Sequence, residues 1–131
     1  MEDSNSSNNL NKGILKKDNI ISQELELLIE LRKDKNLIFS IVDVRELNES
    51  FEFSIKHTDY LIPTTSFYEN IHQIEDKKNT PIIVYCHIGQ RSLYCQKILK
   101  DMGFKKVINL ENGIAGYKGD IVFNSDKFTT L

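Results

Sequence analysis

The chain has 131 residues and a mass of 15.2 kDa, which predicts one domain that is large enough to bury a sizeable core. Its 17 basic and 19 acidic residues leave a net charge of −2, a balance that excludes a general affinity for nucleic acid or for a membrane surface. Two cysteines are too few for a disulfide scaffold, and no apolar run approaches the length of a membrane span. Because the N-terminus also lacks the pattern of a signal peptide, a cytoplasmic protein is expected.

The N-terminal part of the chain is predicted to contain a polar tail and a helix. Residues 1–12 are almost all polar or charged and are expected to be disordered, which leaves 13–131 as the domain. Ser22 is the expected N-cap of a helix that continues to Lys33, after a minimal edge strand at 20–21. The side chains expected to face the core are Ile21, Leu25, Leu28 and Ile29.

A second strand is predicted over residues 37–42, and two charged side chains follow it, Asp43 and Arg45. In a parallel sheet the carboxyl ends of the strands line one crevice, so both side chains should lie on the same edge as the cysteine that ends a later strand. They are candidates for binding an anionic substrate. A role in bracing the neighbouring loop, or a purely structural role, is favoured over direct contact with the substrate.

A short helix is predicted after residue 66. Ser66 and Glu69 have the spacing of a capping box, which typically marks the start of a helix. The helix should leave His72 exposed on its polar side. The side chains expected to be buried are Phe67, Ile71 and Ile74.

The most informative stretch of the chain runs from Pro81 to Met102. The apolar run 82–85 predicts a buried parallel strand, Cys86 follows at its end, and residues 87–90 form a short turn with one glycine. After the turn the apolar period becomes that of a helix, which ends at Gly103 in the left-handed position. The side chains on the core face of this helix are Cys95, Ile98, Leu99 and Met102.

A strand, a tight loop and a helix together form a common anion site in α/β proteins. The amides of the loop and of the first helical turn have no intrahelical partners, and the helix dipole adds positive charge at the same place. A cysteine there should be acidified, and Arg91 adds a cation suited to oxyanions. These features predict that Cys86 is a thiolate nucleophile that faces an anionic substrate. Cys95 is instead expected to be a core residue, not a thiol that forms a disulfide with Cys86.

The last predicted elements are a strand over 106–110, a turn with a short helix over 111–117, and a tail over 119–131 that packs only partly. From Cys86 onward, this part of the chain resembles the active-site half of a rhodanese domain. That family has a strand, Cys-x-x-Gly-x-Arg-Ser/Thr, a helix, Gly-Phe, a strand that ends in Leu, and a Gly-Gly-Ile turn before an aromatic residue. The residues that carry the resemblance are Cys86, Gly89, Arg91, Ser92, Gly103, Phe104, Val107, Asn109, Leu110, Gly113, Ile114 and Tyr117.

Two further segments bear on the resemblance to the rhodanese pattern. Asp-Val-Arg-Glu at 43–46 resembles the end of an early rhodanese strand, whereas the segment 47–63 departs from the family because its Ile-Pro-Gly-Ala piece is missing. His57 in this segment is expected to make a structural hydrogen bond and not to act as a catalytic base. Asn112 replaces the second glycine of the turn, and it tolerates a positive φ. Alternating helices and strands, together with the resemblance, imply a three-layer α/β/α domain with a mainly parallel sheet.

The resemblance implies a sulfurtransferase that moves a sulfane sulfur from thiosulfate or a persulfide donor to a thiol or to cyanide. Cys86 would carry the sulfur as a persulfide and Arg91 would bind the donor, with no metal and no other cofactor. The loop amides would hold the transferred sulfur. The residues expected to form the substrate site are His87, Ile88, Gly89, Gln90, Ser92, Asp43 and Arg45, of which His87, Ile88 and Gln90 would shape specificity.

Two alternatives remain open from the sequence. The first is a protein-to-protein sulfur relay for cofactor or tRNA thiolation, because the chain also resembles rhodanese domains fused to adenylyltransferases that charge sulfur carriers. Its partner would be a sulfur-carrier protein or another thiol protein. The second is a cysteine-based phosphatase or arsenate reductase, which is disfavoured because the Cys86–Arg91 spacing is one residue shorter than in those enzymes.

Overall fold

The computed structural model describes residues 13–34 and 37–123. At its centre lies a five-stranded sheet in which every pair of neighbouring strands is parallel. The expectations for residues 1–12 and 124–131 fall outside the described residues. In spatial order the strands are β1 (Asn19–Ile20), β6 (Val107–Leu110), β5 (Ile82–Tyr85), β2 (Ser40–Asp43) and β4 (Tyr60–Leu61).

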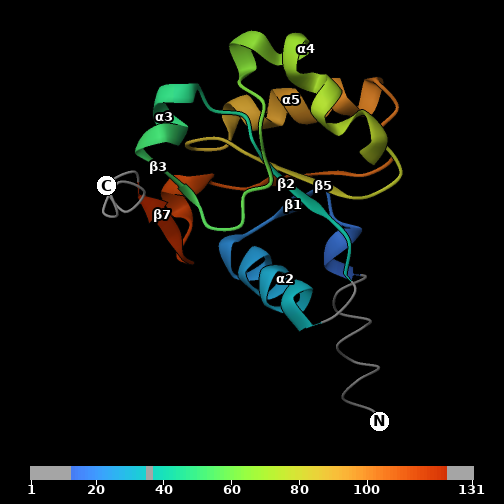
Figure 1. The fold of residues 1–131 in the computed structure, drawn as a ribbon. Coiled ribbons are helices and arrows are strands. Elements are labelled where there is room, and N and C mark those ends of the chain that lie inside the picture. The colour runs from blue at the N-terminus through green and yellow to red at the C-terminus, as the bar shows by residue number, and fades with distance from the viewer. Residues whose placement is uncertain (1–12, 35–36, 124–131) are drawn as a thin grey trace.

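Helices cover both faces of the sheet, as Figure 1 shows. Helix α2 (Ser22–Asp34) lies on one face, and α5 (Gln90–Asp101) lies on the other. The second face also carries α4 (Phe67–Asn70) and the 3₁₀ helix η2 (Ile71–Lys77). The predicted three-layer α/β/α architecture with a mainly parallel sheet is therefore confirmed.

The alternation of side chains along β5 divides the core into two parts. Ile83 and Tyr85 pack with the side chains of α2, whereas Val84 and Cys86 pack with those of α5. All four residues of β5 are buried, as expected for the central strand of a sheet covered on both faces. The alternation places the side chain of Cys86 on the α5 side of the sheet.

Helix α5 ends as the sequence predicts. Met102 is the C-cap, and Gly103 follows with a φ of 97°. The Gly103 N–H donates to the Lys100 carbonyl, and the Phe104 N–H donates to the Leu99 carbonyl, each at 3.1 Å. This is the pair of bonds of a Schellman motif, and it satisfies carbonyls that the end of the helix leaves open.

Three local expectations are wrong. Ser22 is the first residue of α2 and not its N-cap, and its hydroxyl donates to Glu26 at 3.0 Å. Ile21 is 43% exposed because it precedes the first turn of α2, where its N–H donates to the carboxylate of Glu24. Ser66 makes no side-chain cap, so no capping box starts α4. The predicted burial of Leu25, Leu28 and Ile29 and of Phe67, Ile71 and Ile74 is confirmed, as is the exposure of His72.

The part of the chain that was expected to be a loosely packed tail contains a strand. Strand β7 (Ile121–Phe123) pairs antiparallel with β3 (Phe53–Ile55) in a separate two-stranded sheet. A helix, α3 (Leu47–Glu52), leads into β3, and the Glu46 and Glu49 side chains form a capping box at its start. Within 13–34 and 37–123, no helix combines the length and apolar character needed to cross a membrane.

Candidate active site

Cys86 lies directly after β5, at the carboxyl edge of the sheet, and only 1% of its surface is exposed. The chain then turns through Gly89, whose φ of 106° suits a residue without a Cβ, and α5 begins at Gln90. The strand, the glycine turn and the helix thus have the order that the sequence predicts. They place the Cys86 sulfur at the N-terminus of α5, where the amides have no intrahelical partners.

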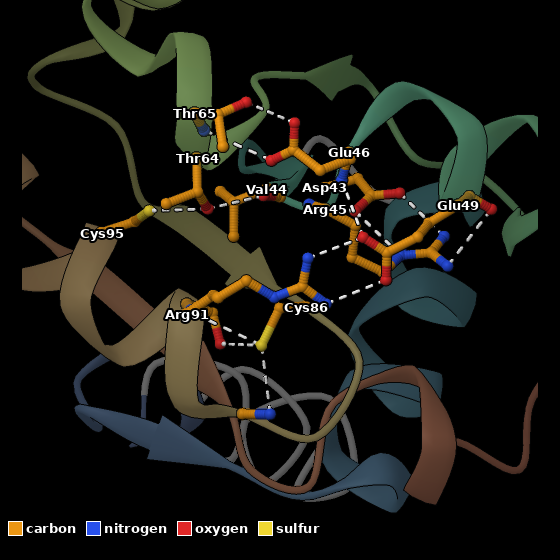
Figure 2. A network of polar contacts seen from close by, with 12 residues as sticks. Asp43, Val44, Arg45, Glu46, Glu49, Thr64, Thr65, Cys86, Arg91 and Cys95 are labelled. Atoms are coloured by element: carbon orange, nitrogen blue, oxygen red, sulfur yellow. Dashed lines mark hydrogen bonds and ion pairs between the residues drawn. The ribbon is translucent and has the colours of Figure 1, made fainter.

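Three hydrogen bonds converge on the Cys86 sulfur. The backbone N–H of Gly89 donates at 3.1 Å and that of Ser92 at 3.4 Å, and the Ser92 hydroxyl lies 3.3 Å away (Figure 2). Burial alone would raise the pKa of the Cys86 thiol, but the bonds from Ser92, Gly89 and the Arg91 amide outweigh it and hold the pKa below its ordinary value. The thiolate is therefore stabilised by neutral donors that a helix N-terminus supplies.

A turn after β6 fixes the loop that carries Cys86. The Ile114 N–H donates to the Cys86 carbonyl, and the Ala115 N–H donates to the His87 carbonyl, each at 2.9 Å. Gly113 has a φ of 58°, and a Cβ on it would lie 2.3 Å from the His87 carbonyl oxygen. The backbone of the turn thus lies against the loop at a distance that only glycine allows.

The guanidinium of Arg91 is bound by the carboxylate of Glu49, at 2.6 and 2.9 Å (Figure 2). The bonds and the charge of Arg91, together with the Glu46 N–H and the charge of Arg45, lower the pKa of Glu49 to about 2. From the sequence, this guanidinium is expected to support the thiolate. In the structure the Arg91 amide helps to do so, while its side chain holds Glu49 of α3 as a two-pronged ion pair.

Asp43 and Arg45 form a second ion pair, which is buried. Arg45 donates to both oxygens of Asp43, at 3.1 and 2.9 Å. It also donates to the backbone carbonyls of Glu49 and Phe53. Since Asp43 and Arg45 are almost completely buried, they fix the position of α3 and β3 and do not face the solvent. Their geometry agrees with the bracing role that was favoured over direct contact with a substrate.

Comparison with known proteins decides the family to which this arrangement belongs. A model of the rhodanese-like domain matches residues 24–120. The chain belongs to the rhodanese-like domain family. In structure it is similar to a rhodanese-like domain protein from Staphylococcus aureus, with a TM-score of 0.66 and 26% identity over 79% of this chain and 94% of that one.

Two curated relatives of this rhodanese-like domain have names that refer to sulfur or tRNA. YrkF of Bacillus subtilis, a candidate sulfur carrier protein, is 31% identical over 66% of this chain and 45% of its own length. A tRNA uridine(34) hydroxylase of Buchnera aphidicola is 35% identical over 72% of this chain and 30% of its own length. The rhodanese-like domain therefore spans less than half the length of these two relatives.

The other residues of the expected site lie on the rim of the same loop. His87, Ile88 and Gln90 are exposed, whereas Ser92 is buried beside the sulfur. The structure thus brings Cys86 together with the loop residues and Ser92. The role of His87, Ile88 and Gln90 in substrate specificity stays a prediction.

His57 lies outside the group of residues around Cys86. It has a φ of 76°, its carbonyl accepts a hydrogen bond from Arg32, and it lines a separate hollow with Lys56 and Tyr117. Cys95 is completely buried on the core face of α5, as expected, with its sulfur 3.7 Å from the Thr64 hydroxyl. Cys86 and Cys95 are both free thiols.

The sequence analysis did not find Glu49, the partner of Arg91. The two residues are 42 positions apart, so no local pattern links them. One signal was present, since Glu46 and Glu49 have capping-box spacing, which could have located α3 at the carboxyl edge of β2. In the described part of the chain, no group of three or more His, Cys, Asp and Glu side chains is arranged to bind a metal ion.

Proposed function

We propose that this rhodanese-like domain is a sulfurtransferase that carries a sulfane sulfur on Cys86. In the first half-reaction the Cys86 thiolate attacks the outer sulfur of a donor such as thiosulfate. The S–S bond of the donor breaks, its electron pair leaves with sulfite, and Cys86 becomes a persulfide. In the second half-reaction a thiolate or cyanide attacks the outer sulfur, and the electron pair of the broken bond returns to Cys86. Both halves balance without an oxidant or a reductant.

The observation that supports this proposal best is the set of three donors around the Cys86 sulfur. Neutral donors stabilise a thiolate, and later a persulfide anion, without the transfer of a proton in the transition state. The turn at Gly113 supports the start of the same loop, because its backbone binds the carbonyls of Cys86 and His87. A nucleophile that must return unchanged after each cycle benefits from such a fixed environment.

A protein-to-protein relay is a second form of the same chemistry. Its specific support is the similarity to YrkF, a candidate sulfur carrier protein. In this form both the donor and the acceptor are thiols of other proteins, and thiosulfate is only a convenient laboratory donor. A cytoplasmic location would suit either form, since the thiol of Cys86 must be regenerated in each cycle.

The test is the intact mass of the protein after incubation with thiosulfate and removal of the excess. We expect one added sulfur on the wild type and on Cys95→Ala, none on Cys86→Ala, and release of the sulfur as thiocyanate when cyanide is added. Hydrolysis of aryl phosphates in the same preparation measures the phosphatase alternative. If the wild type gains no sulfur from thiosulfate or glutathione persulfide, or hydrolyses phosphate esters faster than it transfers sulfur, the proposal is wrong.

A further inference from the structure

Three large apolar side chains are exposed next to the Cys86 loop. Ile88 of the loop is 57% exposed, and Leu93 and Tyr94 of the first turns of α5 are 52% and 62% exposed. Nothing in residues 13–34 and 37–123 covers them. Single exposed apolar residues are ordinary, but a group beside a reactive residue indicates a binding surface.

The same face of α5 forms an open groove. Leu93 and Tyr94 line it together with Gln90, Lys97 and Lys100, which follow one another at helical spacing. Lys100 is held by Asp18 at 3.2 Å, whereas Lys97 has no ion-pair partner among the described residues. The groove therefore combines apolar side chains with one available cation.

The groove begins where the reactive loop ends. Gln90 is the first residue of α5, and Ser92, two residues later, bonds to the Cys86 sulfur. A segment of another protein that lies along the groove therefore reaches the rim of the Cys86 loop. Because the sulfur is nearly buried, a thiol that reaches it must be guided over that rim.

We propose that Ile88, Leu93, Tyr94 and Lys97 form a docking surface for a thiol-bearing protein segment with apolar and acidic residues. This inference rests on the proposed function and names its partner class. The apolar side chains would bind the apolar residues of the segment, and Lys97 would bind its carboxylate. A protein partner is favoured over a small anion because the Arg91 side chain is already bound by Glu49. In the transfer step the partner's thiolate attacks the outer sulfur of the Cys86 persulfide, and Cys86 leaves as the thiolate.

The test compares two kinds of acceptor with the persulfidated protein of residues 1–131. The probes are glutathione, a synthetic peptide with Asp, Leu and Phe before a C-terminal Cys, and the same peptide with Lys in place of Asp. The persulfide is loaded with glutathione persulfide, and its decay after rapid mixing gives a second-order rate constant. The variants are Leu93→Gln with Tyr94→Gln, and Lys97→Glu. Tyr68→Gln, an exposed aromatic residue on α4, is the matched control.

We expect the wild type and the control to prefer the acidic peptide over glutathione. The double variant should lose about tenfold in rate with this peptide, the scale of an interface anchor, and keep its rate with glutathione. Lys97→Glu should reverse the preference between the acidic and the basic peptide. Equal losses with peptide and glutathione, or no loss at all, would overturn the docking surface while leaving the sulfurtransferase proposal in place.

Two other results would also overturn it. If Cys86 takes up no sulfur, the proposed function fails and the docking surface fails with it. If sedimentation equilibrium reveals a dimer that the double variant dissociates, the surface belongs to an interface between copies of this chain.

Discussion

Removing the charge of Glu49 should make the site accept small anionic donors better. In the structure both oxygens of Glu49 hold the Arg91 guanidinium, so a thiosulfate ion must compete with a carboxylate that is already in place. Glu49→Gln keeps the shape of the side chain and an oxygen that can accept from the Glu46 N–H, but it removes the charge. Arg91 is then free to bind the donor.

The size of the effect follows from the pKa of Glu49. Its lowering from 4.5 to about 2 corresponds to about 3 kcal/mol at 1.36 kcal/mol per pH unit. The Glu46 N–H and Arg45 contribute to this lowering, and the side chains of Arg91 and Glu49 are 35% and 30% exposed, so the part that belongs to the pair is reduced to about 1–2 kcal/mol. We therefore expect the KM for thiosulfate to fall by about 5- to 30-fold in Glu49→Gln, with a smaller change in kcat.

The assay is steady-state thiocyanate formation at constant ionic strength, with thiosulfate varied. Glu52→Gln is the matched control, because it removes the same charge from an exposed position of the same helix. An unchanged KM in Glu49→Gln, or an equal fall in both variants, would refute the competition between Glu49 and the donor. Acid unfolding offers a second check. Since the pKa of Glu49 is lowered on folding, the pair stabilises the protein above pH 4.5, and this contribution is lost as the pH falls toward about 2.

Three further predictions concern the loop and the core. Ser92→Ala removes the contact between the Ser92 hydroxyl and the Cys86 sulfur and keeps the bond from the Ser92 N–H, so the pKa of Cys86 should rise, which alkylation rates against pH would measure; an unchanged titration would show that the hydroxyl does not stabilise the thiolate. Gly113→Ala should destabilise the protein by about 2–4 kcal/mol in urea unfolding and slow sulfur transfer, because the added methyl group would overlap a loop carbonyl. Gly13→Ala is the control, because a Cβ at Gly13 meets nothing within 4 Å. Equal losses of stability in the two variants would contradict the reasoning. Cys95→Ala should keep most of the turnover and lose about 1–3 kcal/mol of stability, and a Cys86–Cys95 disulfide after persulfide formation would contradict its role as a core residue.

The sequence predicts the stretch from Pro81 to Gly103 well because its determinants are local. The strand, the glycine turn, the helix and its stop all depend on residues within a few positions of one another. The Schellman bonds at Gly103 and the burial of Cys95 agree with the prediction for that reason. The predictions that Ile21 is buried and that Ser66 caps a helix also used only local patterns, and both are wrong. A local pattern does not decide which side chain meets the core or which one caps a helix.

The contacts that shape the site are not local, and the sequence does not reveal them. Glu49 meets Arg91 only because β2 and β5 are neighbours and α3 follows β2 at their carboxyl edge. Strand β7 was missed since its partner, β3, lies far away in the sequence and both strands have three residues. The unpartnered Lys97 likewise becomes informative only once the ion pairs of the described residues are known.

The bonds between the turn after β6 and the Cys86 loop have a consequence for protein engineering. In a planar trans peptide the C=O and N–H groups point in opposite directions, so anchoring the carbonyls of Cys86 and His87 to the turn directs the following amides away from it. The orientation of the His87 and Ile88 amides, which lead into the donors Gly89 and Ser92, is thus determined by residues 28 positions farther along the chain, since Ile114 binds Cys86 and Ala115 binds His87. A graft of residues 86–92 alone onto another parallel sheet should give a cysteine with ordinary reactivity. A graft that also carries 112–115 on the adjacent strand should transfer the acidified thiol.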